Sequence, residues 1–173
     1  MSLSNIFISK AKAANSLIKT LVNTSAWKEF CDVTLTLKQA RKLDHDRWIK
    51  LDEIEARGAF RHFMNLLNRA VYGNSRRRHG KRLRVVPVLE KAEFAGRWHY
   101  HAAIELPPHI DAIRLEELVH ACWSKVQWSL KRVLVRDGTN EGWINYMLKP
   151  GQKAQFEHWS DSIDWESLYN PIA

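Results

Sequence analysis

Residues 83–106, LRVVPVLEKAEFAGRWHYHAAIEL, decide the fold because they contain two strand-like runs with a short turn between them. The alternating and β-branched residues predict one strand before residue 92 and a second strand from residue 97. A four-residue turn at Glu93 to Gly96 joins the two strands into an antiparallel hairpin. Pro107 and Pro108 end the second strand.

The sequence on either side of the hairpin supplies the remaining elements of an α+β domain. Residues 30–37 and 129–137 alternate as strands do, whereas residues 44–72 and 113–128 have apolar side chains at helical spacing. Gly58 is expected to weaken or break the first of these helices. The resulting β-α-β-β-α-β order predicts a ferredoxin-like, or split βαβ, antiparallel sheet with helices on one face and the active site on the other.

The length of 173 residues predicts a single domain with its core over about residues 30–150. Hydrophobic residues make up 45% of the chain and charged residues 27%, as in ordinary globular proteins, and no apolar run reaches the roughly 20 residues that span a membrane. Residues 3–22 are expected to form a basic amphipathic helix. Cys31 and Cys122 match no disulfide or zinc pattern, so we expect reduced thiols and a cytoplasmic location.

Positive charge is concentrated in residues 71–84, which contain no acidic residue. The cations are Arg76, Arg77, Arg78, Lys81, Arg82 and Arg84. Together with a net charge of +8 and a pI near 9.7, this density predicts a nucleic-acid partner and salt-dependent binding. The alternative is a solvated basic loop. The acidic, tryptophan-containing tail at residues 154–173 is expected to pack back on the domain or to cover part of the basic segment.

His99 and His101 lie on the second strand of the hairpin, and their side chains share one face because strand side chains alternate. With the four-residue turn, Glu90 pairs with His99, and the two β-carbons lie about 5 Å apart on that face. A turn one residue longer or shorter would make Glu93 or Glu105 the candidate instead. Two imidazoles and a carboxylate suit Zn²⁺, and also Mn²⁺ or Mg²⁺ with water and phosphate as further ligands. The alternative is a pair of exposed surface histidines.

Tyr146 and Lys149 lie three residues apart at the end of a helix expected over residues 140–148, so their side chains share a face. A neutral phenol, with a pKa of about 10, is a poor nucleophile and needs a polarised phosphate, a cation or a base. Lys149 is a point charge suited to a phosphate oxygen. With the histidine pair, these residues predict metal-assisted attack of a tyrosine on a phosphodiester. The alternative is a core tyrosine beside a solvated lysine.

The order of the motifs resembles that of the HUH endonuclease superfamily, especially rolling-circle replication initiators with a single tyrosine. The matching motifs are T-L-T-L at residues 34–37, Glu90, H-Y-H at residues 99–101, and Y-M-L-K at residues 146–149. The resemblance implies that Glu90, His99 and His101 are metal ligands, that Tyr146 is the nucleophile and that Lys149 assists it. It also implies that the first motif is structural. Leu148 stands before Lys149, so only one tyrosine is available.

The resemblance further implies a DNA nickase and strand-joining enzyme that initiates rolling-circle replication of a phage, virus or plasmid in the cytoplasm of the host. Tyr146 would form a 5′-phosphotyrosine link and free a 3′-OH. The implied cofactor is Mn²⁺ or Mg²⁺, and the implied partners are single-stranded DNA or an origin hairpin, a host polymerase and a separate helicase, because the chain has no G-x-x-x-x-G-K-[ST] motif. The competing hypotheses are a relaxase, a single-strand transposase, a non-catalytic nucleic-acid-binding module and a zinc hydrolase.

Overall fold

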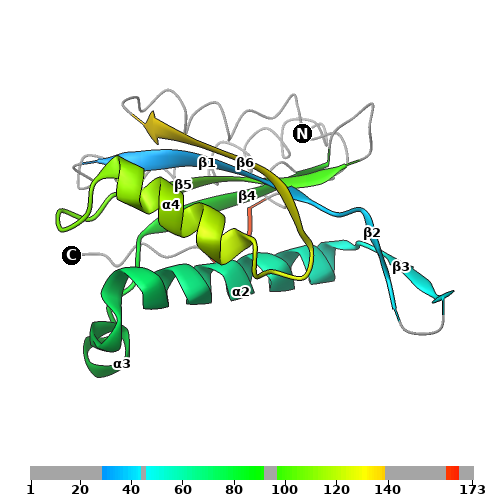
Figure 1. Ribbon diagram of the computed structural model, residues 1–173, viewed down its shortest axis with the longest axis horizontal. Coiled ribbons are helices and arrows are strands. Elements are labelled where there is room, and N and C mark those ends of the chain that lie inside the picture. Colours follow the sequence, from blue (N-terminus) through cyan, green and yellow to red (C-terminus); the bar gives the residue numbers. More distant parts are fainter. Residues whose placement is uncertain (1–28, 44–45, 92–96, 139–162, 168–173) are drawn as a thin grey trace, which may run out of the picture.

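The computed structural model describes residues 29–43, 46–91, 97–138 and 163–167 of the chain (Figure 1). The helices predicted at residues 3–22 and 140–148 lie outside the described residues. None of the described helices is long and apolar enough to span a lipid bilayer.

Four strands form one antiparallel sheet, and they coincide with the four strands predicted from the sequence. They are β1 (Phe30–Leu37), β4 (Val85–Lys91), β5 (Trp98–Glu105) and β6 (Ser129–Gly138). Their spatial order is β4-β5-β1-β6, so the hairpin of β4 and β5 occupies one edge and β1 lies between β5 and β6. The mixed α+β class with an antiparallel sheet is therefore confirmed.

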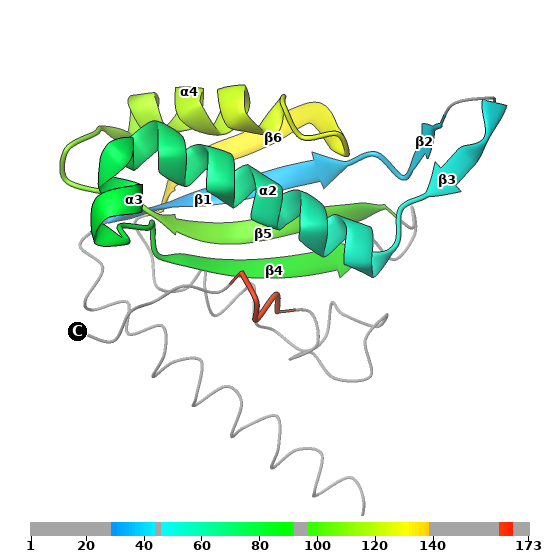
Figure 2. The ribbon, with the colours of Figure 1, turned by 90° about the horizontal axis from the view of Figure 1, so that it is seen from below.

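Three helices accompany the sheet: α2 (Glu53–Tyr72), α3 (Asn74–His79) and α4 (Ala112–Trp123). Helices α2 and α4 lie on one face of the sheet (Figure 2). Each begins at an aspartate whose carboxylate accepts a backbone hydrogen bond from the first turn, Asp52 in α2 and Asp111 in α4. Helix α2 continues through Gly58, which does not break it, and ends at Gly73, where a φ of +52° favours glycine.

The core lies between the two long helices and the sheet. Leu35 of β1 and Tyr100 of β5 point toward the helices and are fully buried, and the Tyr100 ring stacks on Phe60 of α2 with ring centroids 4.3 Å apart. Cys31 is buried in the same cluster, and burial raises the pKa of its thiol to about 11. Because side chains alternate along a strand, the neighbours of Tyr100 in sequence, His99 and His101, point to the opposite face.

The segment predicted as one helix over residues 44–72 contains a strand before the helix, so this prediction is wrong at its start. Strand β3 (Trp48–Lys50) pairs with β2 (Ala40–Lys42), and this two-stranded ribbon projects beyond the end of the sheet (Figures 1 and 2). Trp48 has helical spacing to residues of α2, but the helix can start only after the Asp52 cap. The same spacing placed Ile54 in the core, whereas Ile54 is 78% exposed.

Residues 163–167 of the acidic tail pack along the free edge of β4 (Figure 2). The backbone N–H of Asp164 donates to the Pro87 carbonyl at 3.1 Å. The buried Asp164 carboxylate accepts a hydrogen bond from the Tyr100 hydroxyl at 3.1 Å and lies 3.5 Å from Nη1 of Arg57. Burial and this carboxylate raise the pKa of Tyr100 above its ordinary value. The described part of the tail therefore packs back on the domain, as predicted.

Candidate metal centre

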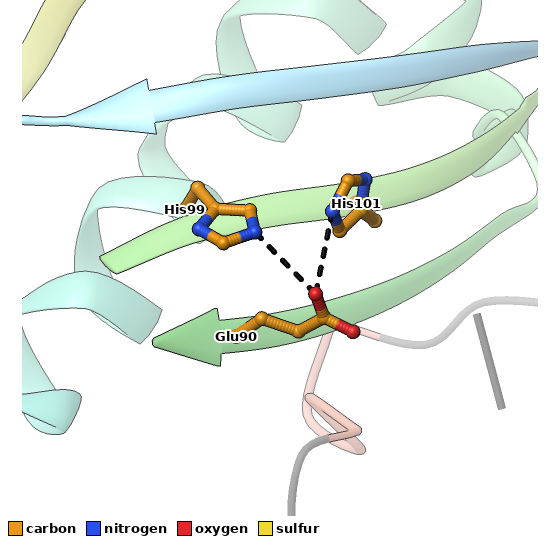
Figure 3. A group of neighbouring side chains, drawn as sticks. All are labelled: Glu90, His99 and His101. Atoms are coloured by element: carbon orange, nitrogen blue, oxygen red, sulfur yellow. Dashed lines mark ion pairs between the residues drawn. The ribbon is translucent and has the colours of Figure 1, made fainter. Parts of the chain in front are cut away.

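Glu90, His99 and His101 meet on the face of the sheet that α2 and α4 leave free (Figure 3). The hairpin pairs Glu90 with His99 and Val88 with His101. This is the register that the four-residue turn predicts, so the predicted pairing of Glu90 with His99 is confirmed. One residue of slippage would have turned Glu90 toward the helices.

The three side chains bring their polar atoms to a common point. Oε2 of Glu90 lies 3.4 Å from Nε2 of His99 and 3.4 Å from Nε2 of His101. The two imidazole rings stand edge to face with centroids 4.9 Å apart. Two ligand atoms that are each about 2.1 Å from one ion lie about 3.0 to 3.4 Å apart for bond angles between octahedral and tetrahedral. The cluster can therefore bind a metal ion.

Hydrogen bonds at Nδ1 fix how the two imidazoles present their other nitrogen. Nδ1 of His99 lies 3.2 Å from the Arg97 carbonyl oxygen, which can only accept, so this nitrogen carries the proton. Nδ1 of His101 lies 3.1 Å from Oγ1 of Thr34, which accepts the same kind of bond. Each ring then has an unprotonated Nε2 directed at Glu90, which is the tautomer that a metal ligand requires.

Thr34 is a site residue whose part the sequence did not reveal. It belongs to the T-L-T-L strand, for which the resemblance implied only a structural role. In the sheet, β1 pairs Thr34 with His101 and Thr36 with His99. The signal that could have identified Thr34 is its parity, because alternate residues of β1 face the same side as the histidines once β1 and β5 are neighbours.

The two alternative carboxylates are not part of the described cluster. Glu105 shares the face of the histidines but lies four residues beyond His101, where it accepts a hydrogen bond from the backbone N–H of Arg84 at 3.0 Å. Glu93 lies outside the described residues. Among the residues that the structure describes, Glu90 is thus the acid that meets both imidazoles.

Another carboxylate on this face has an unusual environment. Asp32 is 8% exposed and pairs across the sheet with Ala103 and Arg136. Burial raises the pKa of the Asp32 carboxyl to about 7, and the charge of Arg136 opposes this rise. Asp32 lies two residues from Thr34 on β1, so it flanks the cluster without belonging to it.

The predicted nucleophile and its partner, Tyr146 and Lys149, lie outside the described residues. Their position relative to the cluster of Glu90, His99 and His101 stays a prediction.

The basic segment is separated from the candidate metal centre by the length of the sheet. Helix α3 lies at one end of the sheet and the β2–β3 ribbon at the other (Figures 1 and 2). Glu90 lies five residues beyond Val85, the first residue of β4 after the basic segment, which corresponds to about 17 Å of strand. Arg77 and Arg78 are exposed on α3. The sequence did not predict this separation, because it depends on how the helix and the hairpin pack.

Comparison with known families places the chain. The family model described as replication-associated protein ORF2 matches residues 30–155, which include the whole sheet, α2, α4 and the candidate metal centre. No curated protein and no solved structure gives a significant match. Since the matched region spans well over half of the chain, the protein belongs to this replication-associated protein family, a membership compatible with initiation of rolling-circle replication.

Proposed function

We propose that the protein is a metal-dependent, single-strand-specific DNA nickase and strand transferase of the HUH type that initiates rolling-circle replication. The observation that carries the proposal is the convergence of Glu90, His99 and His101 on the free face of the sheet in a chain of a replication-associated family. A purely structural pair of histidines would not need a carboxylate 3.4 Å from both.

In this proposal, Glu90, His99 and His101 hold Mn²⁺ or Mg²⁺, and a divalent ion there supplies positive charge to the oxygens of the scissile phosphate. Two imidazoles and one carboxylate leave positions for water and phosphate oxygens. Thr34 orients His101 so that its Nε2 remains directed at the ion.

Tyr146 is the proposed nucleophile. Its phenolic oxygen forms a bond to phosphorus as the P–O3′ bond breaks, and the released 3′-oxygen takes up a proton. Lys149 stabilises the charge that develops on the phosphate. The phosphotyrosine ester preserves the bond energy, so the 3′-OH of a strand can later displace Tyr146 and rejoin the DNA.

The basic segment is proposed to hold DNA at a distance from the reaction. The cations are Arg76, Arg77, Arg78, Lys81, Arg82 and Arg84. Their separation from Glu90 means that a bound DNA molecule extends along the sheet and not only into the metal centre. Their contribution is expected to weaken steeply as salt rises.

The test is covalent capture. The protein is incubated with 5′-end- and internally labelled single-stranded origin DNA and Mn²⁺, and adducts are separated on a denaturing gel. Tyr146→Phe should abolish the adduct and keep DNA binding, and Glu90→Gln should abolish the adduct and weaken Mn²⁺ binding.

Other outcomes contradict the proposal in recognisable ways. An adduct formed by Tyr146→Phe would exclude Tyr146 as the nucleophile. Cleavage without attachment would favour a hydrolase, and binding with neither cleavage nor attachment would favour a non-catalytic module. Adducts on transfer-origin or transposon-end DNA, but not on a replication origin, would favour a relaxase or a transposase.

A further inference from the structure

The two-stranded ribbon of β2 and β3 has two chemically different faces. Its register pairs Ala40 with Lys50, Arg41 with Ile49 and Lys42 with Trp48. Directly paired residues of an antiparallel ribbon share a face, and alternate residues along each strand share it too. Lys42, Trp48 and Lys50 therefore lie together on one face, which we call the outer face.

The opposite face of the ribbon is anchored to the domain. The Arg41 guanidinium lies 4.9 Å from the centre of the Trp128 ring, a cation–π contact. Ile49 packs against the hydrophobic core, and the backbone N–H of Leu51 donates to the Gln39 carbonyl at 2.8 Å. The ribbon is thus fixed in orientation, and its outer face is turned away from the body of the protein.

The outer face presents an indole between two ammonium groups. Trp48 is 67% exposed, and Lys42 and Lys50 are exposed as well. The β-carbons of Lys42 and Trp48 are about 5 Å apart, and Lys50 is one strand pleat, about 7 Å, from Trp48. Lys42 forms an ion pair with Asp46, but both side chains are more than half exposed, so a phosphate can replace the carboxylate at little cost.

The base of the ribbon lies beside the candidate metal centre. The Gln39 side chain accepts a hydrogen bond from the backbone N–H of Trp98 at 2.8 Å and donates to the Trp98 carbonyl at 3.3 Å. Trp98 directly precedes His99, and Thr36, near the end of β1, pairs with His99. Lys42, the partner of Trp48, lies three residues beyond Gln39, or about 10 Å of strand. A strand that passes the metal centre can therefore reach the outer face within a few nucleotides.

We propose that the outer face of the ribbon, formed by Lys42, Trp48 and Lys50, binds single-stranded DNA that flanks the scissile phosphate. Trp48 stacks on one unpaired base, and the two lysines contact neighbouring phosphates. This assignment rests on the proposed nickase function for the position of the DNA. The binding itself depends on no metal and on no chemistry at Tyr146.

The chemistry of the face favours a single strand over a duplex or a protein. An indole can stack on a base of any sequence, whereas the bases of a duplex already stack on one another. Two lysines beside one aromatic ring match a chain that alternates phosphates and bases. An interface with a protein would be expected to show more apolar residues and fewer lysines around the aromatic residue.

The test measures binding of a fluorescently labelled oligothymidylate of about 12 nucleotides by anisotropy, in EDTA, so that cleavage cannot contribute. Stacking on one base is worth about 1–3 kcal/mol, so Trp48→Ala should weaken binding about 5- to 150-fold. Trp48→Tyr keeps an aromatic ring and should retain most of the affinity. The matched control is Trp165→Ala, which removes another exposed tryptophan, 41% exposed, from the far edge of the sheet and should change affinity less than twofold.

Two further measurements identify the contacts. Replacing Lys42 and Lys50 together by Ala should reduce the slope of log affinity against log salt by about 1.4, the value for two phosphate contacts to a single strand. Binding of a blunt duplex of the same length should change less than twofold in Trp48→Ala. Thermal unfolding of each variant shows whether the fold is intact, and Trp48→Tyr provides the test if Trp48→Ala unfolds.

The proposal is overturned if Trp48→Ala binds oligothymidylate as the parent does, or if Trp165→Ala loses as much affinity. An equal loss on the duplex would also overturn it, and unchanged DNA binding would leave the outer face as a protein contact. Failure of the nickase proposal is separate, because it would appear as the absence of a covalent adduct in a protein that still loses oligothymidylate on replacement of Trp48.

Discussion

Replacement of Thr34 by Val tests whether the second layer of contacts around the candidate metal centre matters. Valine has nearly the shape of threonine and the same β-branched preference for a strand, so β1 should be retained. The change removes the hydroxyl whose oxygen lies 3.1 Å from Nδ1 of His101. The imidazole then loses a contact that fixes both its tautomer and its orientation.

The expected effect can be estimated from this hydrogen bond. A hydrogen bond between neutral groups contributes about 0.5–1.5 kcal/mol net, and loss of a partner that orients a metal ligand lowers metal affinity about 10- to 100-fold. The His101 side chain is 22% exposed, so water can partly replace the hydroxyl. We therefore expect the lower end of the range, about a tenfold higher dissociation constant, or about 1.4 kcal/mol.

The assay is calorimetric titration of metal-free protein with Mn²⁺, with Co²⁺ absorption as an independent report on ligand geometry. Thr36→Val is the matched control, because Thr36 lies opposite His99, whose Nδ1 already bonds to the Arg97 carbonyl. It should change Mn²⁺ affinity less than twofold. Equal affinities of the Thr34→Val and Thr36→Val variants would refute the positioning role of Thr34. Unchanged affinity in Glu90→Gln would refute the metal centre itself.

Three other changes test separate parts of the structure. Asp164→Ala should lower the free energy of unfolding by about 3 kcal/mol in urea titrations, because it removes the buried acceptor of the Tyr100 hydroxyl and one of the carboxylates beside Arg57; a loss below 1 kcal/mol would contradict this. Asp32→Asn should stabilise the protein at pH 8, by at most about 4 kcal/mol, because the folded carboxyl pKa of about 7 exceeds the ordinary value of 3.8 and the parent loses stability as pH rises from 4 through 7. The advantage should shrink toward pH 4, and an advantage of the same size at pH 5 and pH 8 would count against the reasoning. Replacing Arg77 and Arg78 by Ala should lower the salt slope of single-strand binding by about 1.4 and leave Mn²⁺ affinity unchanged, as measured by anisotropy and calorimetry.

The hairpin could be predicted from the sequence because its contacts are local. Glu90 and His99 are nine residues apart, and the length of the turn alone decides whether they share a face. The same holds for the relation of His99 to His101, which depends only on the alternation of a strand. The candidate metal ligands were thus predictable without knowledge of the rest of the fold.

The β2–β3 ribbon could not be predicted by the same reasoning. Trp48 and Ile49 are hydrophobic residues just before an amphipathic helix, and periodicity alone extends the helix over them. The structure instead anchors Ile49 and Arg41 to the core and to Trp128, which lies about 80 residues away in the sequence. The local signal that was overlooked is the capping aspartate, Asp52, which marks where the helix begins.

The sequence by itself determined the four strands, the register of the β4–β5 hairpin, the concentration of positive charge and the histidine–glutamate set, because each follows from neighbours within about ten residues. Only the tertiary structure decided that Thr34 supports His101, that Asp164 meets Tyr100, and that the basic segment lies at the far end of the sheet from Glu90. Those contacts join residues 64 or more positions apart or depend on how whole elements pack. The order β4-β5-β1-β6 brings them about, and that order follows from burying the apolar faces of the sheet and the helices against each other.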